Sequence, residues 1–293
     1  MKKILVTGYT GFIGSHLIDS FKKNYEIFGL SRSNNKNSDI VQIKGDIRNI
    51  TAKKIPKNLD AIIHLAATTD VMYCQKNPVE CFDVNVNGTQ NMLEIARQLG
   101  IKFFYISTHH IYGQPKSLPV KENFQPNPES IYSSSKAAAE LVCKTYSSSY
   151  DMDVSLLRIF SVYGPNSPEH LVTNRLISQL FKGDKFEVGN LSPKRDFVYV
   201  KDVVNAIKKI LQKSTGSNTF NIGTGKSYSI KEICNILQKI NNKKMTIHSL
   251  KTLSRKSDVS NIYANNSKIK KLGWKQEINF LDGLKLTCDS YAK

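Results

Sequence analysis

The sequence predicts an α/β protein in which a doubly wound parallel sheet is joined to a smaller C-terminal lobe. Three observations lead to this prediction. Apolar runs of strand length recur along the first half of the chain, helical stretches separate them, and a glycine-rich turn joins the first run to the first helix. Strands that are apolar on both faces are typical of a parallel sheet covered by helices on both sides. Of the 293 residues, 40% are hydrophobic, which is enough for such a core.

The predicted strands and helices alternate along the chain. The five predicted strands are Lys3–Thr7, Tyr25–Leu30, Ala61–Leu65, Phe103–Ser107 and Val154–Arg158. The three predicted helices between or after them are Gly14–Phe21, Val79–Leu99 and Ser133–Tyr150. This succession of βαβ units predicts a single sheet of parallel strands.

From about Gly164 onward the pattern changes to loops and isolated helices. The clearest helices there are Val200–Lys213 and Ile230–Ile240, and Ser229 with Glu232 has the spacing of a capping box for the second. We expect residues 1–163, with a returning segment at about 197–222, to form the larger domain. Residues 164–196 and 223–293 are then expected to form a substrate-binding lobe.

Composition and charge narrow the possible classes of protein. The formal charge of +18 raises the possibility of a nucleic-acid partner, but the lysines are spread in ones and twos without the spacing of a DNA-binding motif. We therefore expect no nucleic-acid partner, although a positive field would attract a polyphosphate cofactor and dianionic substrates. No segment approaches the roughly 20 apolar residues that a membrane span needs. The 5 cysteines are scattered and form no CxxC pair, so we expect reduced thiols in a cytoplasmic protein, without a metal site.

A glycine-rich turn follows the first predicted strand and opens a helix. It contains Gly8, Gly11, Phe12, Ile13 and Gly14. One glycine makes the tight turn, one lets the main chain approach a pyrophosphate, and one packs the helix against the strand. Unpaired N–H groups at the start of the helix then favour an anion. The position of this turn, at the first junction of strand and helix, predicts a Rossmann-type dinucleotide site.

The end of the second predicted strand bears on the choice of cofactor. It reads Ser31-Arg32, where an Asp or Glu in place of Ser31 would bind the ribose hydroxyls of NAD. A small residue followed by arginine leaves room and charge for a 2′-phosphate. These residues favour NADP(H), with NAD as the alternative cofactor. An exposed basic loop without a role in cofactor binding is the other interpretation of this segment.

Tyr132 and Lys136 lie four residues apart in a predicted helix, so both side chains project from one face. A phenol with a pKa of about 10 is a poor acid or base at neutral pH, and we expect the nearby ammonium to lower the pKa of Tyr132. Thr108 ends a predicted strand at the carboxyl edge of the sheet, where its hydroxyl can bind the reacting oxygen. We predict that Thr108, Tyr132 and Lys136 are catalytic.

Taken together, the motifs resemble those of one known family. In the first half they are Gly8/Gly11/Gly14, Gly45–Asn49, His64–Ala67, Asn85–Thr89, Thr108 with Tyr112-Gly113, and Tyr132 with Lys136. In the second half they are Arg158 with Tyr163–Pro165, Arg195–Val203, Phe220–Gly225, Arg255–Asp258 and Leu272–Trp274. In this order they are similar to the extended short-chain dehydrogenase/reductases that modify nucleotide sugars. The resemblance covers nearly the whole chain.

The resemblance implies a role for each matching residue. The implied cofactor contacts are Asp46 and Ile47 at the adenine, Leu65, Ala66 and Ala67 at the pyrophosphate and ribose, and Tyr132 and Lys136 at the nicotinamide end. Tyr132 would donate or accept the proton, assisted by Thr108. The implied substrate contacts are Arg195 and Arg255 at the diphosphate, where a planar guanidinium binds phosphate well, and Asp258 near the ribose. The resemblance also implies a homodimer.

Two positions depart from the family pattern. The 4,6-dehydratases of the family carry an Asp-Glu pair directly after the catalytic threonine, which eliminates water, whereas this chain has His109-His110. We therefore argue against dehydration. We expect the two histidines to shape the substrate pocket, with proton transfer at neutral pH as the alternative role. Ser161 stands where many relatives have an asparagine that contacts substrate.

The expected reaction is hydride transfer between a nicotinamide and a sugar carbon, with Tyr132 moving the proton. Within the family, Ser31 and Arg32 favour an NADPH-dependent reductase of a 4-keto nucleotide-diphosphate sugar. A nucleotide-sugar 4-epimerase that holds NAD tightly uses the same residues and is the alternative. A non-catalytic NADP-binding protein and a nucleic-acid-binding protein are more distant alternatives. The intact set of Thr108, Tyr132 and Lys136 argues against a non-catalytic role.

Overall fold

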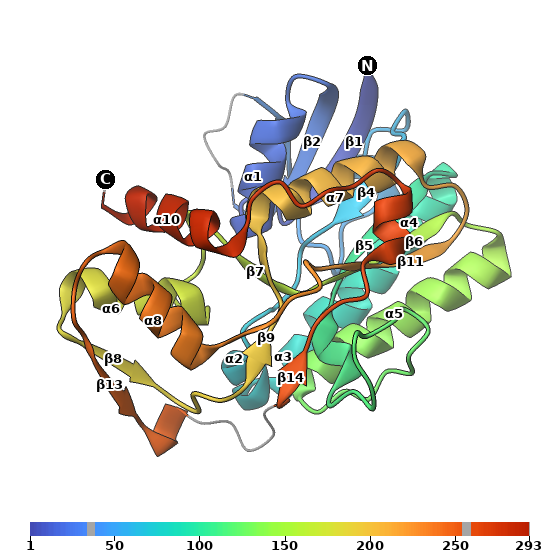
Figure 1. Cartoon of the computed structure of the whole chain (residues 1–293). Coiled ribbons are helices and arrows are strands. Elements are labelled where there is room, and N and C mark those ends of the chain that lie inside the picture. Colours follow the sequence, from blue (N-terminus) through green and yellow to red (C-terminus); the bar gives the residue numbers. More distant parts are fainter. Residues whose placement is uncertain (34–38, 254–258, 293) are drawn as a thin grey trace.

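A seven-stranded parallel sheet forms the centre of the protein (Figure 1). The structure is a computed structural model that describes residues 1–33, 39–253 and 259–292. The strand order is β11-β6-β5-β4-β1-β2-β3, and every neighbouring pair is parallel. The strands are β1 Lys2–Thr7, β2 Tyr25–Ser31, β3 Val41–Lys44, β4 Ala61–His64, β5 Lys102–Thr108, β6 Val154–Ile159 and β11 Asn218–Ile222. The order reverses between β1 and β4, which is where ligands bind in sheets of this kind.

Helices cover both faces of the sheet (Figure 1). Helices α1 (Phe12–Phe21) and α7 (Val200–Lys213) pack together on one face, and α4 (Gly88–Leu99) and α5 (Ile131–Tyr150) pack together on the other. Successive side chains of a strand point to opposite faces, so each strand contributes to two cores.

Strand β1 shows this division of the core. Ile4 and Val6 lie in the cluster that contains the apolar side chains of α1 and α7. Leu5 lies in the cluster that contains those of α4 and α5. All three are fully buried, so β1 is a central strand covered on both sides.

The segment expected as one helix, Val79–Leu99, consists of three pieces. Helix α3 (Pro78–Phe82) is followed by a π-helical turn, η2 (Asp83–Asn87), and then by α4. The side chain of Asn85, in the π-helical turn, accepts a hydrogen bond from the Thr68 N–H at 2.8 Å and donates one to the Thr68 carbonyl at 3.0 Å. The π-helical turn thus joins this helical segment to the loop after β4. Hydrophobic periodicity does not predict such a turn, because it shows only which face of a helix is apolar.

The smaller lobe lies across from the carboxyl ends of the sheet and has its own core. Helices α6 (Val172–Lys182), α8 (Ile230–Ile240) and α10 (Phe280–Tyr291) contribute to that core, and β8 (Lys185–Val188) pairs with β13 (Thr246–Ser249). The remaining elements are α2 Val71–Lys76, α9 Ser267–Lys271, β7 Ser161–Tyr163, β9 Lys194–Arg195, β10 Phe197–Tyr199, β12 Tyr228–Ser229, β14 Asn261–Ile262, and the short turns η1 Ala52–Lys54, η3 His109–Tyr112 and η4 Lys251–Leu253.

The fold class is confirmed, and each expected strand and helix is present to within two residues at either end, apart from the division of Val79–Leu99 into three pieces. The capping box at α8 is also confirmed, since Ser229 Oγ accepts from the Glu232 N–H at 3.2 Å and Glu232 accepts from the Ser229 N–H at 2.7 Å. The residue boundaries of the two lobes stay a prediction. Within the described residues, no helix is long and apolar enough to cross a membrane.

Candidate active site

A cleft of about 1460 Å³ opens between the carboxyl ends of the strands and the smaller lobe. It is lined by every candidate site residue in the described part of the chain: Gly8, Gly11, Phe12, Ile13, Gly14, Ser31, Arg32, Asp46, Ile47, Leu65, Ala66, Ala67, Thr108, His109, His110, Tyr132, Lys136, Ser161 and Arg195. The fold therefore brings together residues that are up to about 190 positions apart, because parallel strands end at one edge of the sheet. Arg255 and Asp258 lie outside the described residues.

The glycine-rich turn at the start of α1 allows two close approaches. Gly8 has a φ of 68°, and a Cβ built there would lie 2.7 Å from the main-chain nitrogen of Ala66. A Cβ on Gly14 would collide with the main-chain oxygen of Gly8. Gly11 is the N-cap of α1 and makes no side-chain cap, so the first N–H groups of the helix are presented at the cleft. This cradle fits a pyrophosphate.

A chain of buried hydrogen bonds fixes the loop that faces this turn. The Ala66 N–H donates to Thr7 Oγ1 at 3.1 Å, and Thr7 Oγ1 lies 2.8 Å from His64 Nδ1. His64 Nε2 lies 3.2 Å from Thr89 Oγ1, which donates to the Asn85 carbonyl at 2.7 Å. Because Thr89 donates to that carbonyl, it accepts from His64 Nε2–H, and Thr7 donates to Nδ1. Burial lowers the pKa of His64 to about 3, so the ring stays neutral.

Asp46 lines the cleft at the end that we expect to hold the adenosine of the cofactor. Arg48 donates to both carboxylate oxygens of Asp46, at 3.0 and 2.7 Å. These hydrogen bonds are the main reason that the pKa of Asp46 is lowered, and the charge of Arg32 adds a smaller effect of the same sign. Arg32, Asp46 and Ser31 therefore lie at one end of the cleft. The Ser31 hydroxyl donates to the Ser33 carbonyl at 2.5 Å, and its oxygen lies 3.3 Å from the phenol oxygen of Tyr9.

Thr108 and Tyr132 meet at the carboxyl end of β5. Tyr132 lies in the first turn of α5 and is 8% exposed. Burial raises the pKa of Tyr132 well above that of a free phenol, and a hydrogen bond with the Thr108 side chain lowers it in part. The expected net lowering of this pKa is therefore wrong for this structure, because desolvation of the phenolate is the largest effect and exceeds the lowering by the Thr108 hydrogen bond. Thr108 Oγ1 also accepts from the His110 N–H at 3.2 Å.

Lys136 lies one turn of helix beyond Tyr132 and is tied to the sheet. Its ammonium donates to the carbonyl of Ile106 at 2.7 Å and lies 4.2 Å from the centre of the Tyr105 ring. Burial lowers the pKa of Lys136 to about 8. A lysine in this state still carries most of its charge at neutral pH and can bind the hydroxyls of a ribose.

The two histidines after Thr108 differ in their surroundings. His109 is 4% exposed, its ring is stacked on that of Phe160 at 5.1 Å, and its Nδ1 lies 3.3 Å from the carbonyl of Ile159. The ring of His110 lies 5.9 Å from that of Tyr132, in an edge-on arrangement. His109 therefore forms part of the wall, whereas His110 adjoins the proposed acid and base.

Arg195 lies where the sheet and the smaller lobe meet. Its guanidinium donates to the carbonyls of Lys194 and Val259, at 2.9 and 2.5 Å. The neighbouring Asp196 is buried, and its carboxylate accepts main-chain N–H groups from Thr224, Gly225 and Ala264 at 2.8, 2.8 and 3.1 Å. The Asp196 carbonyl accepts from the Ser161 N–H at 2.9 Å. This network holds Arg195 and Ser161 on adjacent segments at the cleft.

A buried ion pair joins β6 to α5, the helix that carries Tyr132 and Lys136. Arg158, on β6, donates from Nε to Glu140 Oε1 at 3.0 Å and from Nη2 to Oε2 at 2.7 Å. Glu140 lies one turn beyond Lys136 on α5, and the two paired side chains are 1% and 2% exposed. Arg158 Nη1 also donates to the phenol oxygen of Tyr112 at 2.8 Å. The pair fixes α5 against the sheet.

Several cleft residues were not predicted from the sequence. Residues 68–73 line the cleft immediately after Ala67, and His170 and Arg175 line it from the smaller lobe. The first group could have been found, because it directly follows a strand end at the carboxyl edge. His170 and Arg175 fall in a segment without strand periodicity or a recognised motif, so the sequence offered no signal for them.

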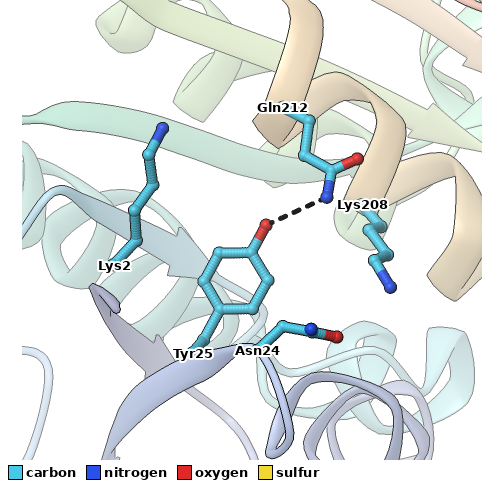
Figure 2. A pocket seen from close by; sticks show the side chains of 5 residues that line it. All are labelled: Lys2, Asn24, Tyr25, Lys208 and Gln212. Carbon is cyan, nitrogen blue, oxygen red and sulfur yellow. Dashed lines mark hydrogen bonds between the residues drawn. The ribbon is translucent and has the colours of Figure 1, made fainter.

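A second, smaller pocket lies at the opposite edge of the sheet. Figure 2 shows the five residues that line its volume of about 320 Å³: Lys2, Asn24, Tyr25, Lys208 and Gln212. Lys2 and Tyr25 begin β1 and β2, so this pocket is at the amino ends of the strands and contains none of the candidate site residues. Among the residues that the structure describes, no group of three or more His, Cys, Asp or Glu side chains could hold a metal ion.

Comparisons with known proteins agree with this arrangement. The sequence model of the GDP-mannose 4,6 dehydratase family matches residues 5–287. The UDP-glucuronate 4-epimerase of Thermodesulfobacterium geofontis is 33% identical, over 97% of this chain and 94% of that protein. The mouse dTDP-D-glucose 4,6-dehydratase (Mus musculus) is 31% identical, over 100% of this chain and 89% of that protein. The structure of UDP-glucuronic acid 4-epimerase from Bacillus cereus, in complex with UDP-glucuronic acid and NAD, superposes with a TM-score of 0.91 at 30% identity and covers 99% of both chains.

Proposed function

The chain belongs to the GDP-mannose 4,6 dehydratase family of extended short-chain dehydrogenase/reductases, and from this premise we propose that it is an NAD(P)-dependent enzyme acting on a nucleotide-diphosphate sugar. Its specific reaction is inversion at the sugar's C4, that of a 4-epimerase. The observation that carries the assignment to this class of enzyme is the hydrogen-bonded pair of Thr108 and Tyr132 at the carboxyl end of β5, one turn before the buried Lys136. The choice of a 4-epimerase is supported by the relatives named above, the UDP-glucuronate 4-epimerase of Thermodesulfobacterium geofontis and the Bacillus cereus 4-epimerase in complex with NAD. A phenol and a hydroxyl suffice to move one proton on and off a sugar oxygen.

Each group of cleft residues has a separate role in binding or in proton transfer. The glycine-rich turn and the start of α1 bind the pyrophosphate, and Lys136 binds the ribose next to the nicotinamide. When bound, the dinucleotide would supply reversible hydride transfer to and from the sugar carbon. Tyr132 reacts as its phenolate, after its own proton has passed to solvent. Tyr132 Oη then takes the proton of the sugar hydroxyl and later gives it back to the same oxygen. Thr108 holds that oxygen in place, and Arg195 binds the diphosphate far from the reacting carbon, which positions the sugar.

The proposal excludes dehydration as the main activity. Elimination of water needs an acid and a base besides the tyrosine, which the Asp-Glu pair supplies in the dehydratases. The corresponding His109 is stacked on Phe160 and contacts the Ile159 carbonyl, so its ring forms part of the wall. His110 alone would have to serve both steps. The family does include dehydratases, such as the mouse relative, so this exclusion requires its own measurement.

A reductase of 4-keto nucleotide sugars is the second candidate, because of Ser31 and Arg32. These residues line the end of the cleft where a 2′-phosphate would lie. An NADPH-dependent reductase must release its oxidised cofactor after every turnover, whereas an epimerase regenerates its cofactor and can keep it. The two candidates use the same Thr108, Tyr132 and Lys136.

The deciding experiment begins with the ligands of the purified protein. We would denature it and identify released dinucleotides by mass spectrometry: retained NAD supports the epimerase, and an empty site that binds NADPH supports the reductase. We would then incubate the protein with UDP-, dTDP-, GDP- and CDP-hexoses and their 4-keto-6-deoxy derivatives. A product of unchanged mass and inverted C4 is expected. Oxidation of NADPH in the presence of a 4-keto sugar would favour the reductase. Loss of water from an intact nucleotide-hexose would show that the protein is a dehydratase after all.

We also propose that the enzyme is a homodimer. Val79 on α3 and Leu141 on α5 are 82% and 66% exposed, and these two helices pack side by side. Large apolar side chains exposed on adjacent helices favour a protein partner. Light scattering after gel filtration should give the mass of two chains, and Leu141→Glu should lower it toward that of one. The cytoplasmic location stays a prediction.

A further inference from the structure

Two thiols lie in contact between neighbouring short helices. Cys74 on α2 and Cys81 on α3 are both free and fully buried, and their Sγ atoms are 2.7 Å apart. This separation exceeds the S–S bond length of a disulfide, about 2.05 Å, by only about 0.65 Å. A bond between them would therefore require the two sulfur atoms to approach by only this distance. The sequence does not reveal this contact, because six residues separate the two cysteines.

This thiol pair is adjacent to the candidate catalytic residues. Cys74, Cys81 and Tyr132 form one buried cluster, with Ile131 packed against it. Cys81 Sγ lies 3.5 Å from the hydroxyl of Ser135, which donates to the Tyr132 carbonyl at 2.8 Å. The thiols are therefore in the layer immediately behind the phenol.

Helix α2 also forms part of the cleft wall. Met72 and Tyr73, its second and third residues, line the cleft. The next residue, Cys74, has its sulfur 3.7 Å from the carbonyl of Thr68, which also lines the cleft. Cys74 and the cleft residues Met72 and Tyr73 belong to the same helix. A shift of the Cys74 side chain would therefore move these two cleft residues as well.

We propose that Cys74 and Cys81 are a reversible oxidation site, whose disulfide forms within the native fold and ties α2 to α3 beside Tyr132. The site does not depend on which reaction the enzyme catalyses. Its effect on turnover rests on the proposed function, so the two are tested by separate measurements.

The oxidant is a low-molecular-weight disulfide, for which oxidised glutathione is the probe. One protein thiol loses its proton to solvent, and its sulfur attacks the glutathione disulfide, which breaks and releases one glutathione thiol. The second protein thiol, after losing its proton, attacks the mixed disulfide and releases the second glutathione. Two protein thiols are thereby oxidised to one disulfide, and one glutathione disulfide is reduced to two thiols. Burial raises the pKa of Cys74, so we expect slow oxidation that proceeds as α2 opens locally.

The sequence makes this disulfide easy to detect. Lys76 lies between the two cysteines, so trypsin separates them into peptides 58–76 and 77–97. After incubation with oxidised glutathione and alkylation of remaining thiols, mass spectrometry should find these two peptides joined. Dithiothreitol should separate them again. Native protein that yields no joined pair, or that joins either cysteine to another thiol instead, would overturn the proposal.

Two variants make the test specific. Cys81→Ser keeps a small polar side chain and should abolish the joined peptides, and Cys74→Ala provides the same test if Cys81→Ser does not fold. Cys234→Ala removes a buried cysteine from the core of the smaller lobe and should leave the joined pair unchanged.

Turnover is measured on the same samples. A shift of a few tenths of an ångström beside a catalytic phenol slows a reaction, so we expect kcat of the oxidised protein to fall by about threefold or more and to recover with dithiothreitol. Cys81→Ser should show no such loss. Equal turnover of the oxidised and reduced protein would refute the link to the active site. If no nucleotide sugar is turned over at all, the proposed function is wrong. The joined peptides would still show whether Cys74 and Cys81 form a disulfide.

Discussion

The ammonium of Lys136 donates a hydrogen bond of 2.7 Å to the main-chain oxygen of Ile106. Ile106 lies two residues before Thr108 on β5, so this bond ties the helix that carries Tyr132 to the strand that carries its hydroxyl partner. The same lysine therefore connects the two halves of the candidate catalytic pair. Because this ammonium is buried, its charge destabilises the folded protein by an amount that depends on pH.

We expect the buried charge of Lys136 to make stability rise with pH. Its pKa is lowered from 10.5 to about 8, so below about pH 8 both the folded and the unfolded protein carry the charge, and the full cost of burying it is present. Between about pH 8 and 10.5 the unfolded chain binds the proton more tightly, and stability rises with pH. Urea unfolding of the parent and of Lys136→Met at pH values across this interval isolates the effect. As pH rises through this interval, the free energy of unfolding of the parent should increase relative to that of Lys136→Met. A difference that stays constant would contradict the lowered pKa.

Replacement of Tyr132 by phenylalanine removes the transferable proton but keeps the ring. Turnover should fall by about 100- to 10,000-fold, the range for loss of a general acid or base. Affinity for the dinucleotide should change little, which fluorescence titration would show. Thr108→Val should lower turnover less, because the phenol remains. Turnover of Tyr132→Phe close to that of the parent would show that another group moves the proton.

Arg32 should discriminate between the two forms of the cofactor. If it receives a 2′-phosphate, Arg32→Ala weakens NADPH binding by about 1.5–3 kcal/mol, the range for hydrogen bonds between charged groups. NADH lacks that phosphate, so its binding should be nearly unchanged. Calorimetric titration of both cofactors measures this difference, and Lys54→Ala, which removes an exposed cation elsewhere, is the control. Equal losses for both cofactors would place Arg32 away from the 2′ position.

Breaking the buried ion pair should destabilise the protein strongly. Glu140→Gln leaves the guanidinium of Arg158 buried without its counter-charge, which should lower the free energy of unfolding by about 3–5 kcal/mol. Glu94→Gln breaks the partly exposed pair with Arg97 on α4 and should have a much smaller effect. Denaturant unfolding of the two variants provides the comparison. Losses of similar size would mean that the buried pair is dispensable.

Much of the sheet could be predicted because its inner strands are apolar on both faces. Strand β3 was not expected, because Val41–Lys44 alternates polar and apolar residues at the edge of the sheet, and only a partner strand reveals such a segment. Strand β11, Asn218–Ile222, is the other edge and was expected only as part of a returning segment. Edge strands lack the continuous apolar run that marks a covered strand.

The site could be predicted as a set of residues but not in its electrostatics. Thr108 was expected at a strand end and Tyr132 and Lys136 on one face of a helix, and all three line one cleft. The direction of the shift in the pKa of Tyr132 could not be predicted, because it depends on how much water the fold excludes. The contact of Cys74 with Cys81 depends on the angle between two short helices, and no sequence pattern encodes that angle.

The edge position of β11 has a consequence for how the chain is made. Residues 218–222 pair with β6, so a growing chain must be about three-quarters synthesised before the sheet can close on that side. Until then β6 presents an unpaired apolar edge, the kind of surface that recruits strands from other nascent chains. A ribosome that pauses before residue 218 would prolong this exposure, and a protein truncated there should depend on chaperones or aggregate.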